Sequence, residues 1–227
     1  MARPDRRVER LSGPARVLAN LARIIAFFTA PFVRYDIRKG CAEQLSVGVV
    51  AANHRSMFDV AAGLVCLHRL GHYPRLLIEK RYVESGWTGP AARAIGAIPV
   101  DRAGARGASL EHAFAALSDG IPVLVMPEGR LHWDPEDPLT TGPAKSGVSR
   151  LAVGGQVPVV PVGLSGTERV LPAGANLPRF NPFRRKVVVC QVAEEPLWLD
   201  GKDHVANTAR VMAAIVDLLR QASRPAA

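Results

Sequence analysis

Short, continuous apolar runs alternate with helical patterns along most of this chain, and this alternation constrains the fold more than any other feature. The apolar runs are rich in β-branched residues, and they predict strands at residues 47–51, 76–78, 98–100, 121–125, 157–162 and 187–192. Apolar residues at helical spacing predict helices at residues 58–69, 90–95, 108–117, 145–153 and 204–222. Strands without polar alternation are typical of sheets that are buried on both faces. The sequence therefore predicts an α/β fold, a single domain whose mostly parallel or mixed sheet is covered by helices.

Length, composition and cysteine content narrow the class of protein. With 227 residues, of which 48% are hydrophobic, the chain is long enough for one domain with a sizeable core and too apolar for intrinsic disorder. Its three cysteines, Cys41, Cys66 and Cys190, are odd in number and far apart. We therefore expect packing cysteines in a reducing compartment, without a disulfide framework or a cysteine zinc site.

The first forty residues carry most of the excess positive charge. They hold nine Lys and Arg against three Asp and Glu, a net charge of +6 out of +9 for the whole chain. A helix predicted to begin near Ser12 leads into an apolar run over residues 17–33, which is too short and too polar at Arg23 to span a membrane. An amphipathic helix lying in the membrane interface, with its arginines among anionic headgroups, fits this pattern better. The residues expected on its lipid side are Leu18, Leu21, Ile24, Ile25 and Phe28.

This interpretation divides the chain into a basic membrane-interface segment, residues 1–40, and a second domain, residues 41–227. It places the protein at the cytoplasmic face of the cell membrane as a peripheral or monotopic protein, with an anionic membrane surface as partner. An ordinary core helix with a basic overhang is the alternative. The few aromatic residues of the segment do not interleave with its charges, so we expect no nucleic-acid partner.

A histidine and an aspartate follow the first predicted strand at a spacing that suits general-base chemistry. The residues read N-H-R-S-M-F-D, with His54 in second place and Asp59 last, at a strand-to-helix turn. The carboxylate can accept one imidazole N–H and fix the tautomer, which leaves the other ring nitrogen free to accept a proton. This is the arrangement of a base and its orienting carboxylate. A structural histidine beside an aspartate is the alternative that spacing alone leaves open.

No nucleophile, metal or cofactor motif accompanies this pair. The chain has no G-x-S-x-G elbow, so a nucleophile would have to come from the substrate. Its six histidines form no H-E-x-x-H or comparable ligand set, and no glycine-rich phosphate or dinucleotide motif is present. We therefore expect neither a metal nor a cofactor.

Four sequence blocks, in order, carry a resemblance to a known family. The first is the N-H-x-x-x-x-D run that ends at Asp59, the second runs over residues 96–102 and ends in an arginine, the third begins P-E-G at 127–129, and the fourth covers 157–162. In this order and spacing they resemble the glycerolipid acyltransferase family, which includes the 1-acylglycerol-3-phosphate (lysophosphatidic acid) acyltransferases. The likeness covers about residues 45–170.

The resemblance implies that residues 41–227 form an acyltransferase domain. Such a domain moves a fatty acyl group from acyl-CoA or acyl carrier protein to the hydroxyl of a lysophospholipid, with 1-acylglycerol-3-phosphate giving phosphatidic acid. On the family pattern His54 and Asp59 are catalytic. The substrate-binding positions implied are Lys80, Arg102, Glu128, Gly129 and Arg130. Backbone N–H groups at the start of the helix near Phe58 are candidate donors to the developing oxyanion.

The third block departs from the family pattern of Glu-Gly-Thr-Arg. Here Glu128-Gly129-Arg130 is followed by Leu and the bulky pair His132-Trp133, so either the family arginine is lost or Arg130 takes its place after a one-residue deletion. Three functions stay open: a lysophosphatidate acyltransferase, a related O- or N-acyltransferase for a non-glycerophosphate acceptor such as an aminoacyl lipid, a glycolipid or a natural product, and a non-catalytic basic module that binds membranes or nucleic acid.

Overall fold

Helices and strands alternate along the chain, as the apolar pattern predicts. The computed structural model describes residues 13–86, 88–101, 108–134, 136–137, 139–201 and 203–223. The elements in chain order are α1 (Gly13–Thr29), β1 (Val33–Arg38), the short 3-10 helix η2 (Ala42–Ser46), β2 (Val49–Ala52), α2 (Phe58–Leu70), β3 (Arg75–Glu79), α3 (Lys80–Glu84), α4 (Gly89–Ala94), β4 (Ile98–Val100), α5 (Ala108–Ser118), β5 (Val123–Val125), α6 (Gly147–Gly155), β6 (Val159–Ser165), α7 (Thr167–Val170), β7 (Lys186–Val192) and α8 (His204–Ala222).

The strands form one mixed, seven-stranded sheet in the order β1-β7-β6-β2-β5-β3-β4. Neighbouring strands are parallel except for β6 and β7, which pair antiparallel. The carboxyl ends of β6, β2, β5, β3 and β4 therefore lie along one edge of the sheet, where the amino ends of β7 and β1 also lie. We call this edge the carboxyl edge; it is where side chains that follow different strands can meet.

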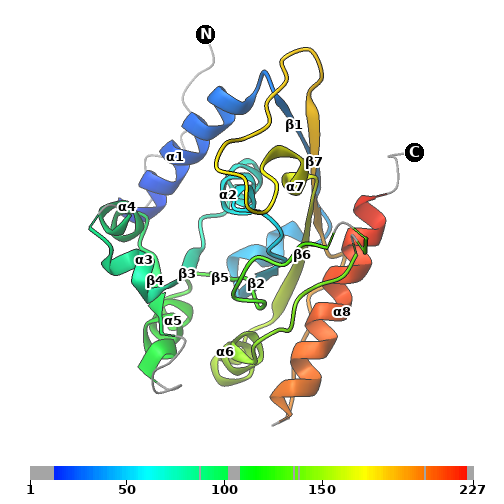
Figure 1. Cartoon of the computed structure of the whole chain (residues 1–227). Coiled ribbons are helices and arrows are strands. Elements are labelled where there is room, and N and C mark those ends of the chain that lie inside the picture. Colours follow the sequence, from blue (N-terminus) through cyan, green and yellow to red (C-terminus); the bar gives the residue numbers. More distant parts are fainter. Residues whose placement is uncertain are drawn as a thin grey trace.

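Helices cover both faces of the sheet, which explains why its central strands have no polar alternation (Figure 1). Val50 and Ala52 of β2 belong to the core beneath α1 and α2, whereas Val49 and Ala51 belong to the core beneath α5, α6 and α8. The three cysteines are buried and unpaired, which fits packing roles. The structure thus confirms the predicted single α/β domain with a helix-covered sheet and an N-terminal helix.

The strand β1 is an element that the periodicity analysis does not predict. It reads VRYDIR and pairs in parallel with β7, with Val33 and Tyr35 buried and Arg34 exposed. An edge strand can carry charges on its open side, and here they continue the basic composition of the residues before it. The sheet therefore begins inside residues 1–40, whose first twelve residues lie outside the described part of the chain.

Helix α1 packs one face against the domain and presents the other to solvent. Leu18 is buried in the core shared with α2, and Leu21 and Ile25 pack against that core. Ile24 and Phe28 are exposed, so the five residues expected on the lipid side divide between two faces. No helix in the described ranges combines the length and apolar character needed to cross a bilayer.

Candidate active site

The loop that leaves β2 is fixed to the neighbouring strand β6 by a buried asparagine. The Asn53 side-chain amide donates to the Leu164 carbonyl oxygen at 2.9 Å and accepts from the Leu164 N–H at 2.8 Å. Because this pair mimics backbone pairing, it continues the contact between β2 and β6 by one step beyond the strand. His54, the next residue, is thereby held at the carboxyl edge.

His54 and Asp59 are in direct contact at the first turn of α2. The His54 Nδ1 atom lies 3.2 Å from Asp59 Oδ2, and the same oxygen accepts the backbone N–H groups of Arg55 at 2.6 Å and Ser56 at 2.7 Å. The Asp59 side chain is fully buried, whereas that of His54 is 16% exposed. The carboxylate can thus accept an N–H from Nδ1, and the tautomer with hydrogen on Nδ1 leaves Nε2 to take a proton from a substrate.

Glu128 connects the turn after β5 to the backbone of His54. One carboxyl oxygen accepts the His54 N–H at 3.1 Å and the other accepts the Gly142 N–H at 3.2 Å. The next residue, Gly129, has φ of 64°, a left-handed conformation that favours glycine. The His132 N–H donates to the His54 carbonyl oxygen at 2.8 Å, so this third block holds the backbone of His54 from both sides.

Burial raises the pKa of Glu128, against the lowering effect of its two backbone donors. A carboxyl group with a raised pKa in the folded state favours folding below its unfolded-state pKa, and this contribution is lost as the pH rises through the folded pKa. We therefore expect the difference in unfolding free energy between wild type and Glu128→Gln to fall as the pH rises above the usual carboxyl range, which begins at about pH 4. Urea unfolding across this range measures it. Glu111→Gln, on the exposed side of α5, is the control, and a difference for Glu128→Gln that is independent of pH would contradict the prediction.

Arg55 is a residue of the site whose position the sequence analysis does not predict. Its side chain is buried, and its guanidinium carbon lies 5.4 Å from the centre of the Trp133 ring. Its Nε and Nη2 atoms have no hydrogen-bond partner among the described residues. Burial lowers the pKa of Arg55, and the carboxylates of Glu168, Glu128 and Asp59 act in the opposite direction. The bulky Trp133, which departs from the family pattern, therefore covers a buried cation beside His54.

The other predicted site residues follow neighbouring strands but do not touch this cluster. Lys80 comes directly after β3 and pairs with Glu84 at 3.5 Å, and Arg130 is exposed. Within the described ranges, neither forms a hydrogen bond or ion pair with His54, Asp59 or Glu128. Arg102 lies outside the described residues. Because β2, β5 and β3 are adjacent and parallel, His54, Glu128 and Lys80 lie in that order along the carboxyl edge.

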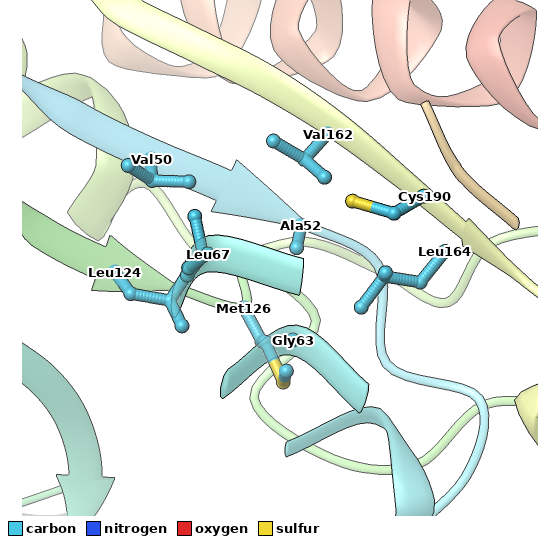
Figure 2. Close-up of a pocket in the computed structure, with 9 residues that line it drawn as sticks. All are labelled: Val50, Ala52, Gly63, Leu67, Leu124, Met126, Val162, Leu164 and Cys190. Atoms are coloured by element: carbon cyan, nitrogen blue, oxygen red, sulfur yellow. The ribbon is translucent and has the colours of Figure 1, made fainter. Parts of the chain in front are cut away.

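A small apolar cavity lies behind the loop, between α2 and the sheet (Figure 2). Its volume is about 10 Å³, roughly the space that a single water needs. Its walls are aliphatic and sulfur-containing side chains, so it is a packing gap and not a substrate pocket. The lining residues are Val50, Ala52, Gly63, Leu67, Leu124, Met126, Val162, Leu164 and Cys190.

Comparison with known proteins identifies the fold and the family of the chain. The chain shares its fold with the crystal structure of the 1-acyl-sn-glycerophosphate (LPA) acyltransferase PlsC from Thermotoga maritima, with a TM-score of 0.69 and 19% sequence identity over 97% of this chain and 88% of that chain. No curated protein sequence matches it significantly. A family model described as Acyltransferase matches residues 39–165, more than half of the chain, and this range includes His54, Asp59 and Glu128. With this match the chain belongs to the Acyltransferase family.

Proposed function

We propose that this acyltransferase moves a fatty acyl group from an acyl thioester, acyl-CoA or acyl carrier protein, to the hydroxyl of a lysophospholipid, and that 1-acylglycerol-3-phosphate is the acceptor and phosphatidic acid the product. The contact of His54 with Asp59 at the carboxyl edge carries the proposal. It supplies an oriented base, and the described site contains no nucleophile in contact with that base.

The reaction needs one proton transfer and one displacement. His54 Nε2 takes the proton of the acceptor hydroxyl as its oxygen attacks the thioester carbonyl carbon. The tetrahedral intermediate collapses with cleavage of the C–S bond, and the imidazolium, beside the Asp59 carboxylate, returns the proton to the leaving thiolate. The products are an ester and a free thiol, and no covalent enzyme intermediate forms.

Part of the backbone at the start of α2 is not free to bind the oxyanion of the intermediate. Three N–H groups there are already used: those of Arg55 and Ser56 by Asp59, and that of Phe58 by the Ser56 hydroxyl oxygen at 3.0 Å. Of the donors that the sequence suggests near Phe58, these three bind acceptors within the protein, and the N–H of Met57, the N-cap of α2, is not among them. We propose the Arg55 guanidinium, whose Nε and Nη2 atoms are buried and have no hydrogen-bond partner among the described residues, as a further candidate donor.

Cations along the carboxyl edge suit a phosphate on the acceptor. We propose that Lys80, Arg102 and Arg130 face this group, because a guanidinium can donate to two phosphate oxygens at once. The exposed Arg130 has no ion-pair partner among the described residues, so its charge is available to a ligand. Gly129 and Glu128 set the turn that presents it.

Arg130→Ala should raise the KM for the acceptor by about ten-fold or more and leave the KM for the thioester nearly unchanged, because a charge-assisted contact contributes about 1.5–3 kcal/mol. Arg130→Lys should recover only part of the loss, since an ammonium group cannot engage two oxygens in the same way. Arg150→Ala, an exposed arginine of α6, is the control.

A panel of acceptors, with products identified by mass spectrometry from a mixed pool of acyl thioesters, tests the reaction itself. Transfer to lysophosphatidate, together with an Arg130 effect on the acceptor KM alone, supports the proposal. Transfer only to acceptors without a phosphate, with an Arg130 effect confined to the donor, favours the second candidate, an acyltransferase for a non-glycerophosphate acceptor. The observation that favours this second candidate is Trp133, which departs from the family pattern and lies over Arg55.

We further propose that the protein works at the cytoplasmic face of the cell membrane as a peripheral or monotopic protein. The exposed face of α1 carries Ile24, Phe27 and Phe28 beside the exposed Arg23, a composition suited to the headgroup boundary of an anionic bilayer. Deleting residues 1–40 would also remove β1 from the sheet, so substitutions on this face are the better test.

A further inference from the structure

The long loop between α7 and β7 lies beside the C-terminal end of α1 at the carboxyl edge (Figure 1). The Phe180 ring stacks on that of Phe32, with centroids 4.6 Å apart, and Arg185 Nη2 donates to the Val33 carbonyl oxygen at 3.1 Å. At its other end, the Leu171 carbonyl oxygen accepts the Ser56 hydroxyl at 2.6 Å. The loop therefore joins the outer end of α1 to the loop that carries His54.

The tip of this loop presents apolar side chains to solvent. Phe183 is 98% exposed and Leu177 is 78% exposed, and Phe27 and Phe28 of α1 are exposed as well. The Asn181 side chain accepts the Phe183 N–H at 2.9 Å, which fixes the turn that holds the ring outward. Two elements far apart in the sequence thus expose large apolar side chains at the same edge, an arrangement that marks an interaction surface.

A basic cleft lies between this tip and the start of β7. Its volume is about 380 Å³, within the range of pockets that hold small ligands. The described residues that line it are Arg169, Asn181, Arg184, Arg185, Lys186 and Val187, with no Asp or Glu among them.

The positive charge of the cleft is poorly compensated. Glu168, which pairs with one of the lining arginines, accepts the Gly166 N–H with both carboxyl oxygens and reaches Arg169 Nε at 3.7 Å. Arg184 has no ion-pair partner within the described ranges, and the ammonium group of Lys186 donates to a backbone carbonyl oxygen, that of Arg169. Burial and the nearby Arg179 lower the pKa of Lys186, as expected where cations gather without acids. Such a cleft suits an anion with several oxygens.

We propose that this cleft binds the phosphate of an anionic phospholipid in the bilayer while Phe183 and Leu177 enter the acyl boundary. The apolar tip beside the cations selects a lipid headgroup over a free anion, because only a bilayer supplies both kinds of contact. The site goes beyond the membrane contact proposed above for residues 1–40. With α1 it gives two points of contact, which turn the carboxyl edge and His54 toward the lipid surface.

Sedimentation of the full chain with vesicles of phosphatidylcholine, with and without phosphatidylglycerol, tests the cleft. Arg184→Glu changes the local charge by two units, and each unit changes affinity for an anionic surface by about five-fold, so we expect about 25-fold weaker binding to the anionic vesicles. Arg150→Glu on α6 makes the same change in net charge on another element and should bind like wild type. Arg184→Gln should fall between wild type and Arg184→Glu, and it guards against a fold defect in the charge-reversed variant.

The apolar tip has its own test. Phe183→Ser should weaken binding to both kinds of vesicle by about ten-fold, because it removes an aromatic side chain from the lipid boundary. Val205→Ser, an exposed apolar residue at the start of α8, is the matched control and should have no effect. Phe27→Ser reports separately on the α1 contact.

The outcomes separate the proposals. Weaker binding of both loop variants, with unchanged controls, supports the second contact. Wild-type binding by Arg184→Glu overturns it, and so does Arg184-dependent binding of inorganic phosphate or RNA without any change in vesicle binding. The vesicle assay needs no acyl transfer, so failure of the proposed reaction leaves its result intact. A loss with Phe27→Ser alone would support the α1 contact and reject the cleft.

Discussion

Replacing His54 with alanine should abolish most acyl transfer and leave the fold intact. Loss of a general base typically lowers the rate by about 10²–10⁴-fold, and we expect kcat of His54→Ala to fall by an amount in this range or more. The fold should survive because the contacts of His54 outside its imidazole are made by its backbone, whose N–H donates to Glu128 and whose carbonyl oxygen accepts from His132. Alanine keeps both contacts. Circular dichroism and the Tm check the fold, and acyl transfer with both substrates in excess gives kcat.

The control for this variant is His112→Ala, which removes an exposed imidazole from α5. It should retain wild-type kcat and Tm. Acyl transfer by His54→Ala at a wild-type rate would rule out His54 as the base, whatever the acceptor. A large drop in Tm for His54→Ala would instead mean that its contact with Asp59 mainly stabilises the fold.

Much of the fold was predictable because its strands are covered on both sides. In β2 and β6 every residue is buried, so the apolar runs had no polar interruptions and were easily recognised. The edge strand β1 differs, because Val33, Tyr35 and Ile37 alternate with charged residues, and its two arginines also fit the basic composition of the N-terminal segment.

The site was predictable where its contacts are local. His54 and Asp59 are five residues apart, across the turn from β2 into α2, so their spacing already indicated an imidazole–carboxylate contact. The contact of Glu128 with the His54 N–H joins residues 74 positions apart and depends on β2 and β5 being neighbours, which no local pattern reveals.

The contact between Arg55 and Trp133 is a second long-range contact that no local pattern reveals. It depends on the path of the residues after β5, which contain few apolar periodicities to guide a prediction. The signal in the sequence was the bulky Trp133, which stands where the family pattern has a small polar residue. A large aromatic ring at such a position indicates that it packs against another side chain of the site. A buried arginine directly after His54 was the available partner.

Asp59→Asn should lower kcat by about 10²–10⁴-fold while preserving most of the local geometry, and this separates the charge of the carboxylate from its shape. An asparagine oxygen in the place of Oδ2 can still accept the N–H groups of Arg55 and Ser56. The amide NH₂ would then stand where Oδ1 now lies, a buried atom without a hydrogen-bond partner among the described residues, at a cost of about 1–3 kcal/mol in the free energy of unfolding.

With asparagine in place, no negative charge would face the imidazolium that forms when His54 accepts the acceptor's proton. If the amide turned its NH₂ toward Nδ1 instead, Nε2 would carry the hydrogen and could not act as the base. Both orientations lead to a slow enzyme with a nearly normal KM, because the fully buried Asp59 side chain is not exposed to a substrate. Kinetics with the full-length protein and urea unfolding measure the two effects, and Asp217→Asn on the surface of α8 is the control. A kcat within a few-fold of wild type would show that the carboxylate only supports the turn at the start of α2, and that His54 works without an orienting charge.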